Sequence, residues 1–217
     1  MANGIVRVGL VGAGGNTRLR HAPGLREQSG VEIVSVANRS RESGERFAGE
    51  FEIPKVYDNW VDLINADDTD AICIGTWPYM HRTLTLAALE AGKHVLCEAR
   101  MAMNAKEAHD MLDASRLKPH LIAQIVPAPG TLDVDSTIQG LIADGYLGEI
   151  LAVKLRVSNT EGRANRNDTF ADTEAPFHWR QNQLLSGYNA MSMGIWYEQL
   201  MRYVGPEIRR ASCRERV

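Results

Sequence analysis

Glycine residues near the start of the chain have a spacing that could hold a phosphate group. The segment GAGGNT begins at Gly12 and follows the apolar run Val6–Val11. In a dinucleotide-binding G-x-G-x-x-G turn, the glycines allow the tight turn, the approach of phosphate oxygens, and close helix–strand packing, in that order. Thr17 occupies the third position, so we expect helix and strand to lie slightly farther apart. The residues predicted to hold a pyrophosphate at the helix N-terminus are Gly12, Gly14, Gly15 and Asn16.

A second polar segment, at Asn38–Arg41, could select between the two pyridine coenzymes. It follows the apolar run Val31–Ala37, about where an acidic residue would bind the ribose 2′-hydroxyl of NAD, roughly 20 residues after the turn. The segment has no carboxylate to repel a 2′-phosphate, and Arg39 or Arg41 could pair with it while Asn38 and Ser40 donate hydrogen bonds. We therefore predict that the coenzyme is NADP or NAD, with NADP favoured. The alternative is that Ser40 only caps a helix and both arginines are solvated.

Apolar runs that alternate with helical patterns predict the elements that position these residues. Such a pattern is typical of a doubly wound α/β fold, in which parallel strands are buried on both faces. The predicted helices include Thr83–Ala91 and Asn104–Lys118, with Ser40 and Asp58 as caps and Gly92 as a helix end. The predicted strands are Val6–Val11, Val31–Ala37, Ala71–Ile74, His94–Cys97 and Leu121–Val126.

A proline- and glycine-rich stretch, Val126–Gly130, predicts a domain boundary. Residues 1–126 would form a dinucleotide-binding domain, residues 127–205 part of a substrate and oligomerisation domain, and residues 206–217 a tail that need not be native. A second domain with a single predicted strand would leave the backbone amides and carbonyls of that strand unpaired, so we expect the chain to be a fragment. The elements predicted after the boundary are a helix at Leu132–Ala143, a strand at Glu149–Val157, and a helix at Leu184–Tyr203 interrupted by Gly187 and Gly194.

Composition argues against several other classes of function. The 217 residues carry a net charge of −3 with a pI near 6.1, and the basic residues form no stripe, so nucleic acid is not an expected partner. No apolar run approaches the ~20 residues of a membrane span and the N-terminus does not read as a signal peptide, so we expect no membrane association and a cytoplasmic location. Cys73 and Cys97 lie in apolar runs without metal-ligand spacing, which predicts neither disulfides nor a metal site.

Further segments give the chain a resemblance to a known family. The turn GAGGNT, the segment Thr76–His81 leading into LAALEAGKHVLCEA, and the later LGEILAV and FHWRQN are similar to the Gfo/Idh/MocA family of sugar and inositol dehydrogenases. The resemblance extends to about Gly205. It implies a Rossmann domain joined to an α/β substrate domain, a bound NAD or NADP, hydride transfer with a sugar or cyclic polyol, and assembly into homo-oligomers.

The chain departs from this family at the positions that handle protons. The family's E-K-P tripeptide resembles Glu98-Ala99-Arg100 here, so a methyl group replaces the lysine. The family's D-x-G-x-H resembles Ser192 to Trp196, which removes the aspartate and the histidine that serves as general base. A general base contributes about 10²–10⁴-fold to such a reaction, so the ordinary relay should be lost. In addition, Trp77 and Pro78 replace the family's Pro-Asn.

Other residues could complete the site. His178, Tyr188 and Tyr197 are the candidates for handling the proton, although a packing or structural role is the more common one for such residues. Glu98, at a strand end, could hold the nicotinamide ribose, and His81 could be a cofactor contact, a helix cap or a packing residue. The residues expected at the nicotinamide end are Thr76, Trp77, Pro78, His81 and Glu98.

Three functions are consistent with these residues. The leading prediction is an NADP-preferring oxidoreductase that acts on a sugar-like or cyclic polyol substrate through an altered proton relay. The second is a dinucleotide-binding protein without turnover, acting as a regulatory or structural subunit. The third is a lyase that oxidises its substrate transiently with a retained NAD(P).

Overall fold

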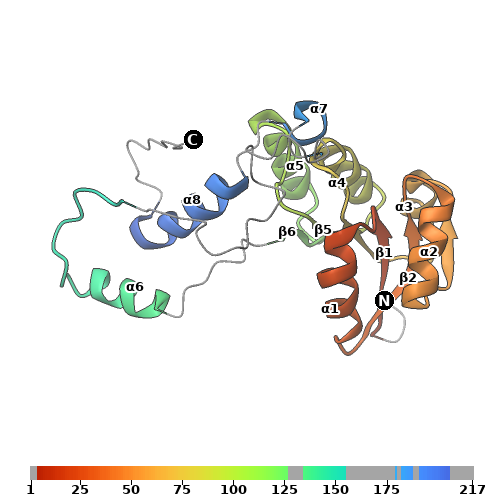
Figure 1. Cartoon of the computed structure of the whole chain (residues 1–217), viewed down its shortest axis with the longest axis horizontal. Helices are drawn as coiled ribbons and strands as arrows, with labels where there is room; N and C mark the ends of the chain where they lie inside the picture. The colour runs from red at the N-terminus through yellow and green to blue at the C-terminus, as the bar shows by residue number, and fades with distance from the viewer. Residues whose placement is uncertain (1–3, 127–133, 155–178, 180–181, 188–190, 206–217) are drawn as a thin grey trace, which may run out of the picture. The chain divides into compact units, whose positions relative to one another are not determined.

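The structure is a computed structural model in which residues 4–126, 134–154, 179, 182–187 and 191–205 are described (Figure 1). Its contacts divide the chain into two units. The first contains residues 1–126 together with 181–188, and the second contains residues 127–180 and 189–217.

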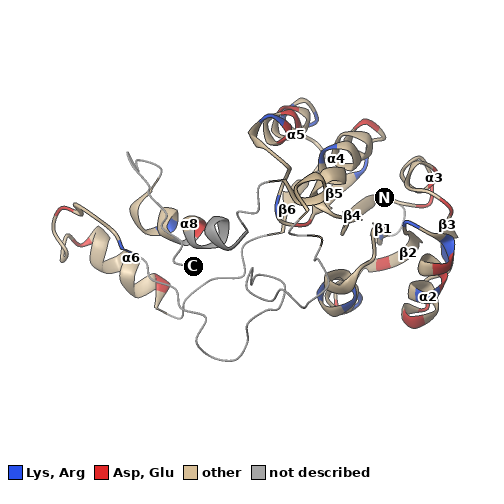
Figure 2. Cartoon of the chain, turned by 45° about the horizontal axis from the view of Figure 1, so that its top comes forward, with Lys and Arg blue, Asp and Glu red and all other residues tan. Residues whose placement is uncertain are grey.

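The first unit is built on a six-stranded parallel sheet, in the order β3-β2-β1-β4-β5-β6 (Figure 2). This confirms the predicted doubly wound α/β fold. Four strands have the predicted bounds, whereas β6 is shorter than expected and the edge strand β3 was not predicted. The strands are β1 (Val6–Val11), β2 (Val31–Ala37), β3 (Lys55–Tyr57), β4 (Ala71–Ile74), β5 (His94–Cys97) and β6 (Ala123–Ile125).

Helices cover both faces of this sheet because its strands carry apolar side chains on both sides. One core joins β1 and β2 to the first two helices through residues such as Leu10, Val36 and Phe47. The other joins β4 and β5 to the next three through residues such as Ile72 and Leu84. Figure 2 shows α2 on one side of the sheet and α4 and α5 on the other. The helices are α1 (Ala22–Arg26), α2 (Arg41–Phe51), α3 (Trp60–Ile64), α4 (His81–Glu90) and α5 (Ala105–Leu117).

The helix boundaries follow the capping residues with one correction. Ser40 Oγ accepts a hydrogen bond from Ser43 N at 3.3 Å and caps α2, as predicted. The cap of α3 is Asn59, whose Oδ1 accepts from Asp62 N, and not Asp58. The carboxylate of Asp58 instead contacts Arg41, with 2.6 Å between Oδ1 and the guanidinium. Adjacent polar residues of similar capping strength cannot be ranked from the sequence alone.

The two cysteines of the sheet belong to opposite faces. Cys73 pairs with Leu96 in the β4–β5 register and Cys97 pairs with Ile74, so their side chains alternate across the sheet. Cys73 lies in one core and Cys97 in the other. Burial raises the pKa of each thiol to about 12. Both therefore act as small apolar residues.

The second unit contains two described helices, α6 (Asp135–Ala143) and α8 (Met191–Val204). They contact one another, with a hydrogen bond from Gln139 Nε2 to Arg202 O at 3.3 Å. The predicted strand at Glu149–Val157 is not formed in its described part, because residues 149–154 have no regular secondary structure. Gly194 does not interrupt α8, in contrast to our expectation. Gly187 does separate two helices, since it follows α7 (Gln183–Ser186), a helix that belongs to the first unit.

An ion pair at the amino edge of the sheet provides a test of its acid stability. Asp70 accepts from Arg7 Nε at 3.0 Å, from its NH2 at 2.7 Å and from its backbone N at 2.9 Å, which joins β1 to the start of β4. The hydrogen bonds from Arg7 lower the pKa of Asp70 to about 2. The stabilisation is therefore present at neutral pH and is lost as the pH falls from about 4 towards 2.

We expect Asp70→Asn to lower the free energy of unfolding at pH 7 by on the order of 1 kcal/mol, allowing for the solvent around Arg7. The variant should also lose less stability than the wild type between pH 4 and pH 2. Urea unfolding across this range measures both. Parallel acid limbs for the two proteins would contradict the assignment.

Candidate functional site

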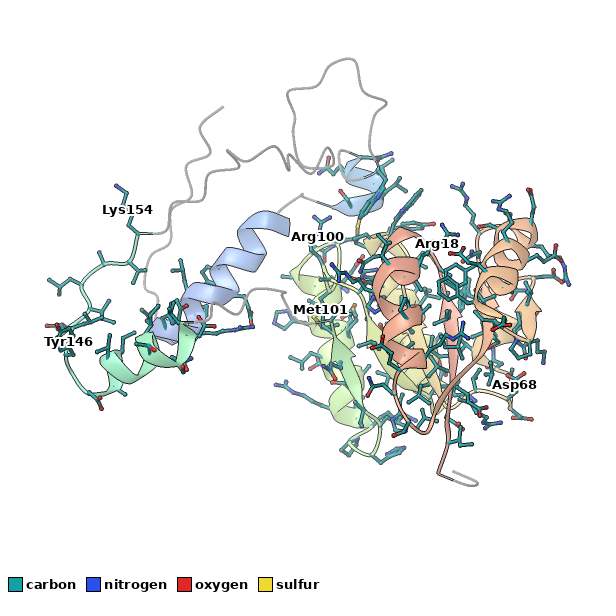
Figure 3. The ribbon with its side chains drawn as sticks, turned by 60° about the horizontal axis from the view of Figure 1, so that its bottom comes forward. Arg18, Asp68, Arg100, Met101, Tyr146 and Lys154 are labelled. Atoms are coloured by element: carbon teal, nitrogen blue, oxygen red, sulfur yellow. The ribbon has the colours of Figure 1, made fainter. Side chains whose placement is uncertain are left out.

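The glycine-rich turn lies at the point where the strand order changes direction. β1 pairs with β2 on one side and with β4 on the other, so the loops after these strands meet at the carboxyl edge of the sheet. Ligands of open α/β sheets bind in this position. In Figure 3, Arg18 and Arg100 mark this edge, and Asp68, which precedes β4, lies at the other.

Gly12 fixes the geometry of the turn. Its φ is +82°, a region that side chains other than glycine rarely adopt. A Cβ at this position would lie 2.5 Å from Thr76 Cγ2 and 2.7 Å from Thr76 N. Gly12 N donates to Ala37 O at 2.9 Å, which ties the turn to β2. The first glycine of the pattern is thus required both by its backbone angles and by the adjacent loop.

The next two glycines leave the backbone accessible. A Cβ at Gly14 or Gly15 would meet no atom of the described chain within 4 Å. The helical run at residues 15–26 begins here, with a π-helical segment at Thr17–His21, so its first amides point towards this surface. The buried Thr76 Oγ1, across from Gly12, has no hydrogen-bond partner among the described residues. These features fit a diphosphate, which needs close backbone approach and several donors.

Thr17 is accommodated by a glycine that directly follows another strand. Its side chain is 2% exposed, and its Oγ1 lies 3.4 Å from Gly12 O. A Cβ at Gly75, directly after β4, would overlap Thr17 Oγ1 and would lie 2.7 Å from Gly12 O. The space that the third glycine usually leaves next to the first strand is therefore provided by Gly75.

The residues after β2 are engaged in different ways. Asn38 Oδ1 accepts from Ala13 N at 2.7 Å, and its Nδ2 donates to Ser43 Oγ at 3.1 Å, so Asn38 anchors the glycine turn. Arg41 pairs with Glu45 and Asp58, which raise its pKa. With Ser40 capping α2, three of the four predicted residues already have structural partners.

Arg39 is an exposed cation of this segment. Its guanidinium carbon lies 5.8 Å from the centroid of the Trp77 ring, which follows β4. Among the described residues Arg39 forms no ion pair, in contrast to Arg41. The structure therefore brings together the ends of β2 and β4, which were predicted to bind opposite ends of a coenzyme.

Glu98, at the end of β5, is linked to the helix that follows the glycine turn. Its Oε1 contacts His21 Nε2 at 2.5 Å and accepts from Asn16 Nδ2. Burial would raise the pKa of Glu98, but the hydrogen bonds from His21 and Asn16 outweigh it, and the pKa is lowered. His21 was not among the predicted site residues, since no local pattern marks a partner 77 positions away.

The His21–Glu98 contact should couple the two elements energetically. In a double-mutant cycle of His21→Gln and Glu98→Gln, we expect a coupling of about 1–2 kcal/mol in the free energy of unfolding, because the partners are only 10% and 14% exposed. The contribution of Glu98 should be lost as the pH falls below the usual range of a carboxyl group, since its pKa is lowered.

An exposed pair provides the matched control for this cycle. Arg18 and Glu50 lie 2.8 Å apart, with side chains 46% and 43% exposed. The corresponding cycle of Arg18→Gln and Glu50→Gln should give less than about 0.5 kcal/mol. Equal couplings at the two pairs would contradict a special role for His21 and Glu98.

His81 is fully buried at the start of α4. Its Nδ1 contacts Arg100 O at 2.7 Å and its Nε2 contacts Thr76 O at 2.9 Å. Burial lowers its pKa, although the two carbonyl oxygens act in the opposite direction. Because both ring nitrogens are engaged, His81 is placed to hold the loops after β4 and β5 together. Pro78, three residues before it, is buried as well.

The expected proton-handling residues are less well defined. Ala99 is exposed directly after Glu98, so the position resembling the family's lysine presents a methyl group. Tyr197 lies on α8 and is 42% exposed. The backbone of α8 contains Ser192 and Trp196, whose side chains are outside the described residues, as are His178 and Tyr188 altogether.

Two absences concern only the described residues. No group of three or more His, Cys, Asp or Glu side chains in this part of the chain is placed to hold a metal ion. None of the described helices combines the length and apolar character needed to cross a bilayer.

Comparison with known sequences finds an oxidoreductase family. The family model described as an oxidoreductase family with an NAD-binding Rossmann fold, Gfo/Idh/MocA, matches residues 6–123. A trans-1,2-dihydrobenzene-1,2-diol dehydrogenase of Bos taurus is 29% identical over 201 residues, which cover 93% of this chain and 55% of the relative. A 1,5-anhydro-D-fructose reductase of Ensifer adhaerens is 39% identical over 110 residues, 51% of this chain and 33% of the relative.

Solved structures show the same architecture. A myo-inositol 2-dehydrogenase from Lactobacillus plantarum matches with a TM-score of 0.58 and 25% identity, covering 67% of this chain and 43% of the other. A mutant of a 3-ketoreductase from Actinomadura kijaniata, in complex with TDP-benzene and NADP, matches with a TM-score of 0.59 and 25% identity, covering 67% and 44%. The chain spans about half, or less, of the length of these relatives.

Proposed function

The chain belongs to the Gfo/Idh/MocA family of oxidoreductases, and we propose that it forms the coenzyme-binding part of an NAD(P)-dependent enzyme acting on a sugar-like or cyclic polyol substrate. The observation that carries the proposal is Gly12, whose positive φ and contact with Thr76 place open backbone at the point where the strand order reverses. The names of the relatives, a diol dehydrogenase and a sugar reductase, support the substrate class.

Each group of residues has a distinct role in this proposal. The backbone around Gly12, Gly14, Gly15 and Asn16 binds the diphosphate at the helix N-terminus. Thr76 Oγ1 is available to donate a hydrogen bond, and Glu98 orients the turn through Asn16. A bound nicotinamide would supply the site at which a hydride is accepted or released.

We favour NADP as the coenzyme. The segment Asn38–Arg41 contains no carboxylate that would repel a 2′-phosphate, and Arg39 presents an exposed guanidinium there. A planar guanidinium can pair with a phosphate through two donors. The NADP complex of the 3-ketoreductase relative supports the same choice.

The proposal keeps the proton relay apart from coenzyme binding. Because Ala99 has no titratable group, the proton must be carried by another residue, for which Tyr197, Tyr188 and His178 are the candidates. The division into residues 1–126, 127–205 and a tail at 206–217, together with homo-oligomerisation and a cytoplasmic location, belongs to the same proposal.

Calorimetric titration with NADPH and NADH tests the binding step. We expect NADPH to bind more tightly than NADH. A screen of sugars and polyols, following the absorbance of the reduced nicotinamide, then tests turnover. The absence of affinity for both coenzymes would overturn the proposal.

The second candidate is a coenzyme-binding subunit without turnover. It is favoured by one observation: Ala99 replaces the lysine found at this position in the family, next to the retained Glu98. Tight binding of NADPH together with no absorbance change on any substrate would support this candidate over the enzyme. The screen should include the same family domain from a relative that retains the lysine, as a positive control.

A further inference from the structure

We propose that Trp77 is a specificity-determining residue that holds Arg39 at the adenosine end of the coenzyme, so that the pair Arg39–Trp77 recognises the 2′-phosphate of NADP. This inference rests on the proposed function. From the sequence, Trp77 was expected at the nicotinamide end of the coenzyme. The present inference assigns it to the opposite, adenosine end. It also gives a physical role to a residue that replaces the family's usual proline.

The guanidinium of Arg39 contacts the indole ring of Trp77. The Arg39 guanidinium carbon lies 5.8 Å from the centroid of the Trp77 ring, within the range of a cation–π interaction. A guanidinium that stacks on a ring keeps its N–H donors directed outwards in its plane, so they remain available to a phosphate. Indole is the most favourable of the aromatic rings for this interaction.

Arg39 and Trp77 follow two different strands of the sheet. Arg39 follows β2 and Trp77 follows β4, the two strands that flank β1. The glycine turn after β1 lies between the ends of these two strands, so the pair spans the turn. In a dinucleotide-binding domain the ribose 2′ position of the adenosine half lies near the end of β2.

The backbone of Trp77 is held in an extended conformation. Trp77 is extended, with φ −75° and ψ 154°, and precedes the buried Pro78. Its carbonyl oxygen accepts from Met80 N at 3.1 Å. A residue before proline is restricted to such a conformation, so the backbone that carries the indole is held in place.

Arg41 and Arg18, two other cations near the turn, already form ion pairs with carboxylates. Arg41 contacts Asp58 and Glu45, and Arg18 contacts Glu50. Arg39 is the cation in this region whose described contact is an aromatic face instead of a carboxylate. Binding of a phosphate by Arg39 therefore breaks no ion pair, whereas binding by Arg41 would compete with two.

The test compares variants of both partners by calorimetry with NADPH and NADH, using the full chain. Arg39→Ala should weaken NADPH binding by roughly 10- to 100-fold, because a charge-assisted hydrogen-bond pair is lost. Trp77→Leu should weaken it by roughly two- to fivefold, since only the support is lost. Both should leave the NADH affinity within about twofold.

A double variant distinguishes positioning from direct contact. If Trp77 acts through Arg39, Trp77→Leu should have no further effect on NADPH binding once Arg39 is alanine. Trp77→Phe should recover part of the selectivity because it retains an aromatic face. One control is Tyr79→Phe, because the ring centroid of Tyr79 lies 6.4 Å from that of Trp77. The other is Arg46→Ala, an exposed arginine that contacts Glu42. Neither should change the ratio of the two affinities.

The outcomes separate this inference from the proposed function. Equal losses for NADPH and NADH in Trp77→Leu would overturn the inference, since the ring would then contact a group common to both coenzymes. A ratio of NADPH to NADH affinity that is unchanged in Trp77→Leu would overturn the inference as well. So would a wild-type protein that prefers NADH. In these cases the proposal that the chain binds a coenzyme would stand. A wild type that binds neither coenzyme would overturn both. Circular dichroism and thermal melting establish that each variant is folded.

Discussion

Gly12→Ala is expected to remove coenzyme binding, with a loss of affinity for NADPH of more than about 100-fold. The backbone at Gly12 has a φ of +82°, which costs an L-residue roughly 1–2 kcal/mol. In addition, the new Cβ would lie 2.5 Å from Thr76 Cγ2 and 2.8 Å from Thr76 Cα. The loop after β4 would have to move, and the amides of the turn would move with it. Calorimetry with NADPH measures the loss.

The same variant should also lower the free energy of unfolding by about 1–3 kcal/mol, because the clash is with backbone atoms that cannot rotate away. Gly49→Ala is the matched control. Gly49 lies inside α2 and a Cβ there meets nothing within 4 Å, so alanine should be neutral or stabilising by up to about 1 kcal/mol. A Gly12→Ala protein that binds NADPH like the wild type would contradict the role of the turn.

The architecture was predictable because it depends on local patterns. The four strands β1, β2, β4 and β5 are apolar runs buried on both faces, and their bounds agree with prediction. The edge strand β3 was missed because it has three residues, one of them an exposed lysine, and so lacks a run long enough to recognise. The described part of the predicted strand at Glu149–Val157 is irregular, so alternation of apolar and polar residues did not by itself determine a strand there.

The candidate site was predictable only in part, because its contacts join distant segments. The glycine turn could be located from the sequence, since its residues are consecutive. In contrast, Asn38 contacts Ala13 across 25 positions, and Glu98 contacts His21 across 77. The approach of Trp77 to Arg39 depends likewise on the order of strands in the sheet. Pairings of this kind follow from topology, which residue types and spacing do not specify.

Gly75→Ala is expected to destabilise the first unit by about 2–4 kcal/mol, more than other glycine variants of the sheet edge. Its Cβ would overlap Thr17 Oγ1 and lie 2.7 Å from Gly12 O, so it would push the first helix and the glycine turn away from β4. Urea unfolding measures this loss. Gly24→Ala, where a Cβ meets nothing within 4 Å, is the control and should change the stability little.

The pairing of Gly75 with Thr17 predicts a rescue. Thr17→Ala removes the overlapping hydroxyl, so in the Gly75→Ala background it should restore about 1 kcal/mol, although alone it should be mildly destabilising because Thr17 is buried. Restoration should remain incomplete, because the contact with Gly12 O persists. Additive losses in the double variant would show that Gly75 does not provide the space for Thr17. A rescue would show that Gly75, directly after β4, provides the space that the third glycine of the turn usually leaves.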